Sequence, residues 1–269
     1  KTGKQYTVGE LMKASLIVSG NDATALLARQ LYGSENEFAK QMNKKAAEIG
    51  LKTAVFYNST GLPVYPKDIQ NKMSIRDLAK LSQYILNNYP EILDITSIKE
   101  IKDPNSDKIF ENTNPLLGTI EGVDGLKTGN TRKAGSCLVW TMRTSGDLPG
   151  RLLGVHLGFK KGEIRDRVLT QYANFVKDNY SVNSWVSKDR PIYLYVKDAP
   201  NKFIPIYPQD EFNDRAFNDY DLQISLNEGL SLPFKAGDVI GSIALTHNGI
   251  THFSTGLIIK NNFGKKKFC

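Results

Sequence analysis

A lysine set between two glycines is the first feature of this sequence that could do chemistry. Lys127 lies in the stretch VDGLKTGNTRKAGSCLVW, residues 123–140, with Gly125 two positions before it and Gly129 two positions after it. Glycine weakens a strand and usually marks a bulge or a close approach to the backbone. The stretch therefore indicates a strand that something approaches closely beside a fixed positive charge.

A second candidate is the tripeptide Ser19-Gly20-Asn21, which interrupts a helical pattern. A structural explanation stays open for each motif taken alone. Ser19 or Asn21 could cap a helix by accepting hydrogen bonds from free backbone N–H groups. Lys127 could equally mark a turn or an edge strand. The two motifs together, 108 residues apart, carry more information than either one.

The elements that must position these residues are helices in the first part of the chain. Thr7 followed by Glu10 matches a capping box, so a helix is expected from Thr7 to the break at residues 19–21. Apolar residues then recur with helical spacing, and Gly50 and Pro90 supply stop signals. The further expected helices cover residues 22–32, 34–49, 74–89 and 163–180.

From Gly135 onward the apolar period changes to two. Residues 135–144 and 151–159 are expected to be strands joined by a turn in SGDLPG. After residue 180 only short β runs remain, and Asn248-Gly249 is a strong hairpin signal. We therefore expect an α/β (α+β) domain over residues 1–180 and a small all-β sandwich domain over residues 181–269.

The pair of motifs resembles two of the three signatures of penicillin-binding proteins and serine β-lactamases. The segments SGNDATALLARQLYGSENEFAKQMNKKAAEIGLKTAVFYNSTGL and NPLLGTIEGVDGLKTGNTRKAGSCLV are similar to the low-molecular-mass D-alanyl-D-alanine carboxypeptidases. This similarity covers nearly all of residues 5–180, and LPFKAGDVIGSIAL resembles the β-rich C-terminal domain of the same family. The resemblance implies a transpeptidase/β-lactamase-like fold for the first domain.

The same resemblance implies an activity. The family members are serine-type carboxypeptidases that remove the terminal D-alanine from peptidoglycan stem peptides through an acyl-enzyme, and β-lactams acylate them. The expected partners are therefore stem peptides ending in D-Ala-D-Ala and β-lactam antibiotics. No metal or organic cofactor is expected.

The resemblance also implies the roles of individual residues. Ser19 would relay a proton, and Asn21 would donate its side-chain amide to a substrate carbonyl. Lys127 and Thr128 would receive the terminal carboxylate of the substrate through charge-assisted hydrogen bonds.

The end of the Lys-Thr-Gly motif would bind the substrate backbone. Gly129 would leave room for a substrate that lies along the strand edge, as an added strand does. The backbone N–H of Asn130 would supply one arm of an oxyanion hole.

The third signature of the family, Ser-x-x-Lys, is absent, because no serine of the 269 residues has a lysine three positions later. That motif supplies the nucleophile and its base. We expect the chain to be N-terminally incomplete and inactive by itself.

Charge and composition argue against other classes of function and leave a nucleic-acid-binding protein as a distant third alternative. The net charge of +7 is scattered through expected helices, without the dense stripe or interleaved aromatic residues of a nucleic-acid-binding protein. No window approaches eighteen consecutive apolar residues, so no transmembrane helix is expected. Cys137 and Cys269 provide no disulfide framework, and Cys137 is expected in the core. His156, His247 and His252 are too few and too widely spaced for a metal site.

Two rival interpretations remain beside the carboxypeptidase. One is another serine acyl hydrolase of the superfamily, a β-lactamase or an endopeptidase, and the other is a catalytically inactive module that binds cell-wall peptides. Family resemblance places the protein outside the cytoplasmic membrane, at the cell surface and associated with the membrane through a C-terminal segment. The three lysines at 265–267 are weak evidence for such an anchor.

Overall fold

The computed structural model describes residues 3–214 and 219–266, so Lys267 and Cys269 lie outside the described residues. The chain divides into two compact units. The first comprises residues 1–144 and 151–178, and the second comprises residues 145–150 and 179–269.

The expected helices of the first unit are all present. Thr7 caps the first of them through a complete capping box: its hydroxyl accepts the N–H of Glu10 at 3.2 Å, and its own N–H donates to the Glu10 carboxylate at 2.7 Å. Ser34 and Ser74 cap two later helices, because each hydroxyl accepts the backbone N–H of the residue three positions further on. The helices are α1 (Val8–Ile17), α2 (Asn21–Tyr32), α3 (Glu35–Glu48), α4 (Ile75–Asn88), α6 (Gly162–Asn179) and a short α5 (Ile92–Thr96) that the sequence pattern did not predict.

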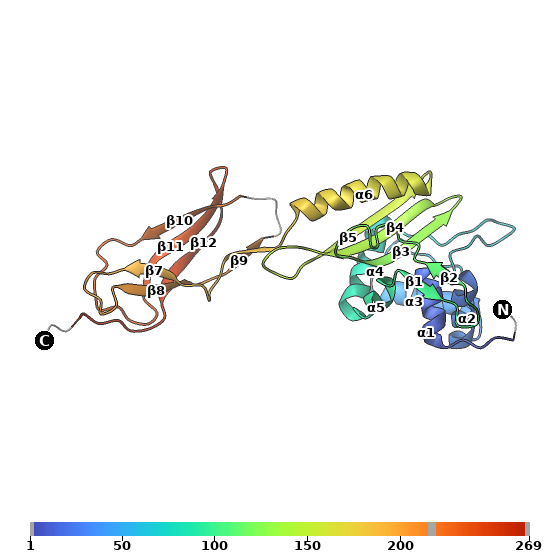
Figure 1. Cartoon of the computed structure of the whole chain (residues 1–269), viewed down its shortest axis with the longest axis horizontal. Coiled ribbons are helices and arrows are strands. Elements are labelled where there is room, and N and C mark those ends of the chain that lie inside the picture. Colours follow the sequence, from blue (N-terminus) through green and yellow to red (C-terminus); the bar gives the residue numbers. More distant parts are fainter. Residues whose placement is uncertain (1–2, 215–218, 267–269) are drawn as a thin grey trace. The chain divides into compact units, whose positions relative to one another are not determined.

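A three-stranded antiparallel sheet in the order β3-β4-β5 is the main sheet of this unit. Its strands are β3 (Val123–Thr131), β4 (Gly135–Arg143) and β5 (Arg151–Phe159), and a small separate ladder pairs β1 (Glu100–Lys102) with β2 (Ile109–Glu111). Helix α6 lies over one face of the sheet, and α4 and α5 lie on the other (Figure 1). Covered on both faces and paired on both edges, β4 is almost continuously buried, which explains its apolar run Leu138-Val139-Trp140.

Strand β3 has a different environment. Among the described residues no strand pairs with its outer edge, because it ends the sheet order. Burial decreases along it, from Val123 and Asp124, which are buried, to Gly129 and Asn130, which are exposed. The fold therefore anchors the start of β3 and presents its far end, with a free edge, to solvent.

An ion pair between the buried Asp124 and the half-buried Arg151 fixes the anchored end of β3. The Arg151 guanidinium at the start of β5 donates to both carboxylate oxygens of Asp124, at 2.6 and 2.9 Å, and to the Thr141 hydroxyl of β4 at 2.9 Å. Two parallel hydrogen bonds of this kind fix the orientation of both groups. One guanidinium thus ties all three strands together.

The second unit is all-β, as expected. A five-stranded antiparallel sheet in the order β10-β11-β12-β8-β7 and the two-stranded ladder β6-β9 contribute to one hydrophobic core, in which Val186, Ile204, Ile243 and Leu257 are buried. Asn248 and Gly249 both have positive φ in the β11–β12 turn, at 51° and 78°. The strands are β6 (Asn183–Val186), β7 (Ile192–Tyr195), β8 (Phe203–Pro208), β9 (Phe212–Asp214), β10 (Asp221–Leu226), β11 (Val239–His247) and β12 (Ile250–Ile259).

Candidate functional site

The two sequence motifs meet in the first unit although 108 residues separate them. The Lys127 ammonium on β3 donates to the Ser19 hydroxyl oxygen at 2.8 Å and to the Thr128 carbonyl oxygen at 2.9 Å. A hydroxyl held this close to an amine can exchange a proton with it. The structure therefore brings Ser19 and Lys127 into direct contact.

The break between α1 and α2 sets the position of Ser19. Its φ of 60° lies in the left-handed region, which a residue with a Cβ adopts at a cost of about 1–3 kcal/mol. The N–H of Gly20 then donates to the Ala14 carbonyl at 2.9 Å, and a Cβ on Gly20 would lie 3.2 Å from that oxygen. A larger residue at position 20 would therefore fit only tightly in the chain reversal that turns the Ser19 side chain toward Lys127.

The capping explanation for this motif is not supported among the described contacts. Gly20 is the N-cap of α2, and no side chain caps that helix. Asn21 is the first residue of α2, and its exposed side chain forms no hydrogen bond with any described residue. The structure therefore places Asn21 next to the Ser19–Lys127 pair without joining it to the pair.

Lys127 is a half-buried cation with no counter-ion among the described residues. Burial lowers its pKa from the usual 10.5 to about 8. None of the described carboxylates forms an ion pair with it, since its two hydrogen bonds go to a hydroxyl and a carbonyl. A desolvated ammonium with no anionic partner favours the binding of an anion from solution.

Thr113 is a site residue that the sequence analysis missed. Its backbone N–H and its hydroxyl both donate to the Ile17 carbonyl at the end of α1, at 3.1 and 3.2 Å. Its hydroxyl oxygen lies 2.6 Å from that of Thr128 on β3, which leaves Thr128 as the donor of that hydrogen bond. Thr113 thereby connects the end of α1 to β3. No spacing signal marks it, because a lone Thr in a polar loop is common.

Gly129 and Gly125 have opposite surroundings. A Cβ built on Gly125 would lie 2.8 Å from the Thr96 hydroxyl and 3.3 Å from Leu93, so packing inside the protein requires glycine there. A Cβ on Gly129 would meet nothing within 4 Å, and the backbone of Gly129 is not left-handed. No contact within the described chain requires glycine at position 129.

Other polar side chains of the first unit lie outside this site. The Arg165 guanidinium donates to the Cys137 carbonyl at 3.1 Å and pairs with Asp166, so it attaches α6 to β4. Cys137, expected in the core, is only half-buried, because it lies near the exposed end of the β3–β4 hairpin. No group of three or more His, Cys, Asp and Glu side chains that could hold a metal occurs within residues 3–214 and 219–266.

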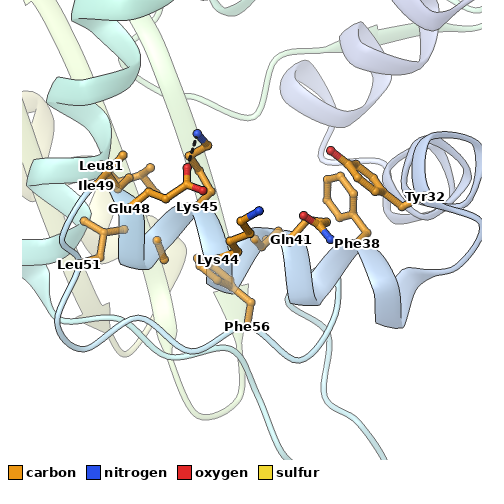
Figure 2. A pocket seen from close by; sticks show the side chains of 12 residues that line it. Tyr32, Phe38, Gln41, Lys44, Lys45, Glu48, Ile49, Leu51, Phe56 and Leu81 are labelled. Carbon is orange, nitrogen blue, oxygen red and sulfur yellow. Dashed lines mark ion pairs between the residues drawn. The ribbon is translucent and has the colours of Figure 1, made fainter.

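One cavity of the first unit lies away from this site. A cavity of about 530 Å³ follows one face of α3, with Phe38 and Tyr32 at one end and Ile49, Leu51 and Leu81 at the other (Figure 2). Its charged groups include Lys45 and Glu48, which pair with each other at 2.6 Å. It contains none of the motif residues, so it is not the candidate site.

The fold and the candidate site together indicate a class of protein. A mixed α/β domain in which a Ser-x-Asn motif at a helix break meets a Lys-Thr-Gly motif on an edge strand is typical of the penicillin-binding proteins and serine β-lactamases.

Comparison with known proteins narrows this class. Residues 1–158 match the family model described as D-alanyl-D-alanine carboxypeptidase. The chain is 30% identical over 275 residues to D-alanyl-D-alanine carboxypeptidase DacF of Bacillus subtilis, covering 99% of this chain and 69% of the relative. The chain belongs to the D-alanyl-D-alanine carboxypeptidase family, and it spans about two thirds of the length of the curated relatives it matches.

Solved structures agree with this family. Penicillin-binding protein 5 of Haemophilus influenzae is 26% identical with a TM-score of 0.62, covering 97% of this chain and 76% of that chain. Penicillin-binding protein D2 of Listeria monocytogenes, in a cefotaxime-bound form, is 31% identical with a TM-score of 0.55, covering 65% of this chain and 69% of that chain. The expected combination of a transpeptidase-like domain and a β domain is thus confirmed.

Proposed function

We propose that the protein is a serine-type D-Ala-D-Ala carboxypeptidase of peptidoglycan stem peptides and that Ser19, Asn21 and Lys127 take part in its chemistry. The observation that carries this proposal is the half-buried Lys127 ammonium, which lies 2.8 Å from Ser19 and has no carboxylate partner among the described residues. The family membership and the names of the relatives support the same reaction. They favour it over a β-lactamase, an endopeptidase or an inactive binding module.

The substrate carboxylate binds at the start of the exposed part of β3. The protonated Lys127 ammonium supplies the charge, and the Thr128 hydroxyl supplies a second hydrogen bond. Thr128 donates to Thr113 in the free structure, so its proton must turn toward the carboxylate when substrate binds. This exchange costs little, because the Thr113 hydroxyl can turn and donate to Thr128 while the Thr113 backbone N–H still donates to the Ile17 carbonyl.

The peptide backbone of the substrate lies along the free edge of β3. The absence of any neighbour around Gly129 leaves room for a chain that is not part of the described structure. The N–H of Asn130 donates to the carbonyl oxygen as negative charge develops on it. The Asn21 amide donates to a second carbonyl of the substrate.

The reaction is an acyl transfer. A serine nucleophile adds to the carbonyl carbon, the C–N bond breaks, and the leaving D-alanine amine takes a proton through Ser19 and Lys127. Water then hydrolyses the ester. A β-lactam follows the first half of this course, with its carboxylate on Lys127 and Thr128.

Intact mass spectrometry after incubation with benzylpenicillin tests the proposed function. We expect the full-length protein to gain one penicilloyl group per molecule. The 269-residue chain by itself is expected to gain none, because it contains no Ser-x-x-Lys pair. A stoichiometric adduct on Ser19 of the 269-residue chain would show that Ser19 is a nucleophile and that the assigned roles are wrong.

We also propose that the two units are separate domains with the connection near residues 178–190. Residues 188–190 form an exposed turn, which exposes the Lys188 backbone to a protease. Limited trypsin digestion is expected to cut after Lys188 before it cuts after Lys235. Early cleavage at Lys235 with residues 188–190 still protected would contradict two domains.

The place of action follows from the substrate. Peptidoglycan lies outside the cytoplasm, so we propose an extracytoplasmic protein at the cell surface that associates with the membrane. Among the described residues, no helix has the length and apolar character needed to cross a membrane. Lys265 and Lys266 are described and Lys267 is not. Co-sedimentation of the full-length protein with anionic vesicles would measure this association.

A further inference from the structure

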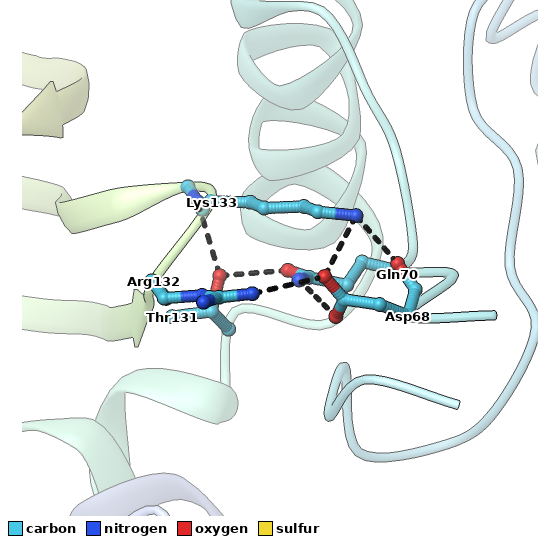
Figure 3. Close-up of polar contacts among 6 residues, drawn as sticks. Asp68, Gln70, Thr131, Arg132 and Lys133 are labelled. Atoms are coloured by element: carbon cyan, nitrogen blue, oxygen red, sulfur yellow. Dashed lines mark hydrogen bonds and ion pairs between the residues drawn. The ribbon is translucent and has the colours of Figure 1, made fainter. Parts of the chain in front are cut away.

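A loop far away in the sequence holds the turn that follows the substrate-binding end of β3. The Thr131 hydroxyl donates to the Gln70 side-chain oxygen at 2.7 Å, across 61 residues of sequence, and accepts the N–H of Ala134 at 3.0 Å. Both hydrogen-bonding functions of this hydroxyl are thus used, one to close the β3–β4 turn and one to tie that turn to the loop (Figure 3).

The same loop makes a second, charged attachment. The Lys133 ammonium contacts the Asp68 carboxylate at 2.9 Å and donates to the Asp68 carbonyl at 2.7 Å. Arg132 lies 3.4 Å from the same carboxylate (Figure 3). Asp68 has a φ of 48° in a turn closed by the Val64–Ile69 bridge, so its carbonyl and its carboxylate both face the hairpin. We call these contacts of Asp68 and Gln70 with Thr131, Arg132 and Lys133 the clamp.

The direction of the bound substrate decides which part of it lies beside the clamp, and this step rests on the proposed function. With the carboxylate on Lys127 and Thr128 and the reacting carbonyl at Asn130, the substrate runs along β3 toward Thr131. Its acyl side therefore continues beside the clamp. The N–H of Asn130 is one residue before Thr131, where the clamp takes hold.

The clamp compensates for a weakness of this strand. The far end of β3 is exposed, and no described strand supports its outer edge, so within the sheet only β4 pairs with it. An oxyanion donor must keep its position to a fraction of an ångström to stabilise the developing charge. An anchor on the neighbouring residue restricts the position of that donor.

We propose that Gln70 and Asp68 are positioning residues that hold the Asn130 N–H and the acyl-side wall of the site in place. They touch no reacting atom. Their removal should slow the acylation step and leave the affinity for the substrate carboxylate intact, because Lys127, Ser19 and Thr128 lie outside the clamp.

The test compares variants of the full-length protein in acylation by benzylpenicillin. The double variant Asp68→Ala/Gln70→Leu removes both attachments, and we expect its first-order acylation rate constant to fall roughly 10- to 100-fold, as for a displacement of up to about 1 Å. The half-saturating penicillin concentration is expected to change less than about threefold. Thr131→Ser keeps the hydroxyl and is expected to retain the wild-type rate.

Two further variants serve as a control for the clamp test and as an alternative to the double variant. Glu37→Ala breaks an exposed ion pair with Lys40 on α3 and should leave acylation unchanged. Lys133→Met breaks the charged attachment from the exposed hairpin side and should slow acylation in the same direction even if the double variant does not fold. A wild-type acylation rate in the folded clamp variants overturns the clamp proposal alone. A wild-type protein that penicillin does not acylate overturns the proposed function, and the clamp proposal with it.

Discussion

Lys127→Ala in the full-length protein is expected to slow acylation by penicillin roughly 10- to 150-fold. The variant loses a charge-assisted hydrogen bond to the ligand carboxylate, which contributes about 1.5–3 kcal/mol. At about 1.4 kcal/mol per decade this corresponds to the stated range, before any contribution from proton transfer through Ser19. The same loss is expected in kcat/KM for peptides ending in D-Ala-D-Ala.

The stability of Lys127→Ala separates a functional from a structural role. Burial holds the pKa of Lys127 at about 8, below its usual 10.5, so the charged form is disfavoured in the folded state. Charged Lys127 therefore lowers the free energy of unfolding at every pH below about 8. This destabilisation disappears as the pH rises from about 8 to 10.5. At pH 7 the variant should melt no lower than the wild type.

Measuring the stability of both proteins at two pH values tests whether charged Lys127 destabilises the fold. Between pH 7 and pH 9.5 the wild type should gain stability relative to Lys127→Ala, because other titrating groups are common to both proteins. A large fall in the melting temperature of the variant, with acylation unchanged, would show that Lys127 only supports the strand. Lys127→Arg is expected to restore charge without restoring the rate, because a planar guanidinium does not replace a compact ammonium.

Arg151→Met is expected to lower the free energy of unfolding by about 3 kcal/mol. The variant leaves the buried Asp124 carboxylate without the guanidinium that bonds both of its oxygens at 2.6 and 2.9 Å. Removing one partner of a buried pair typically costs about 3–5 kcal/mol, and the partial exposure of Arg151 places it at the lower end of that range. Urea denaturation gives the free energy of unfolding directly.

A matched control tests whether burial of the Asp124–Arg151 pair causes the expected loss of stability. Lys102→Met breaks a pair with Asp107 in which both side chains are largely exposed, and it should cost no more than about 1 kcal/mol. Combining Arg151→Met with Asp124→Leu removes both charges of the pair and should recover part of the loss. Equal losses for Arg151→Met and Lys102→Met would contradict the claim that the three strands depend on the buried pair.

Local signals in the sequence were sufficient for most of the secondary structure. The capping box of Thr7 and Glu10 and the caps Ser34 and Ser74 each join residues three positions apart. The Asn248-Gly249 turn likewise needs only its own backbone angles. Such signals predict an element because the hydrogen bonds that define it form within a few residues of one another. The short elements α5, β1, β2, β6 and β9 were missed, since segments of three to five residues carry too little periodicity.

For the candidate site, too, sequence and tertiary structure determined different features. The sequence by itself determined the residue types of the two motifs, through their resemblance to a known family. Only the tertiary structure decided that Ser19 lies 2.8 Å from Lys127, that the pKa of Lys127 falls to about 8, and that Gln70 holds Thr131. These contacts join residues 108 and 61 positions apart, so they arise from how helices pack on the sheet. Thr113, Gln70 and Arg151 look like ordinary polar residues in the sequence, because the side chain that each one meets is set by packing and not by spacing.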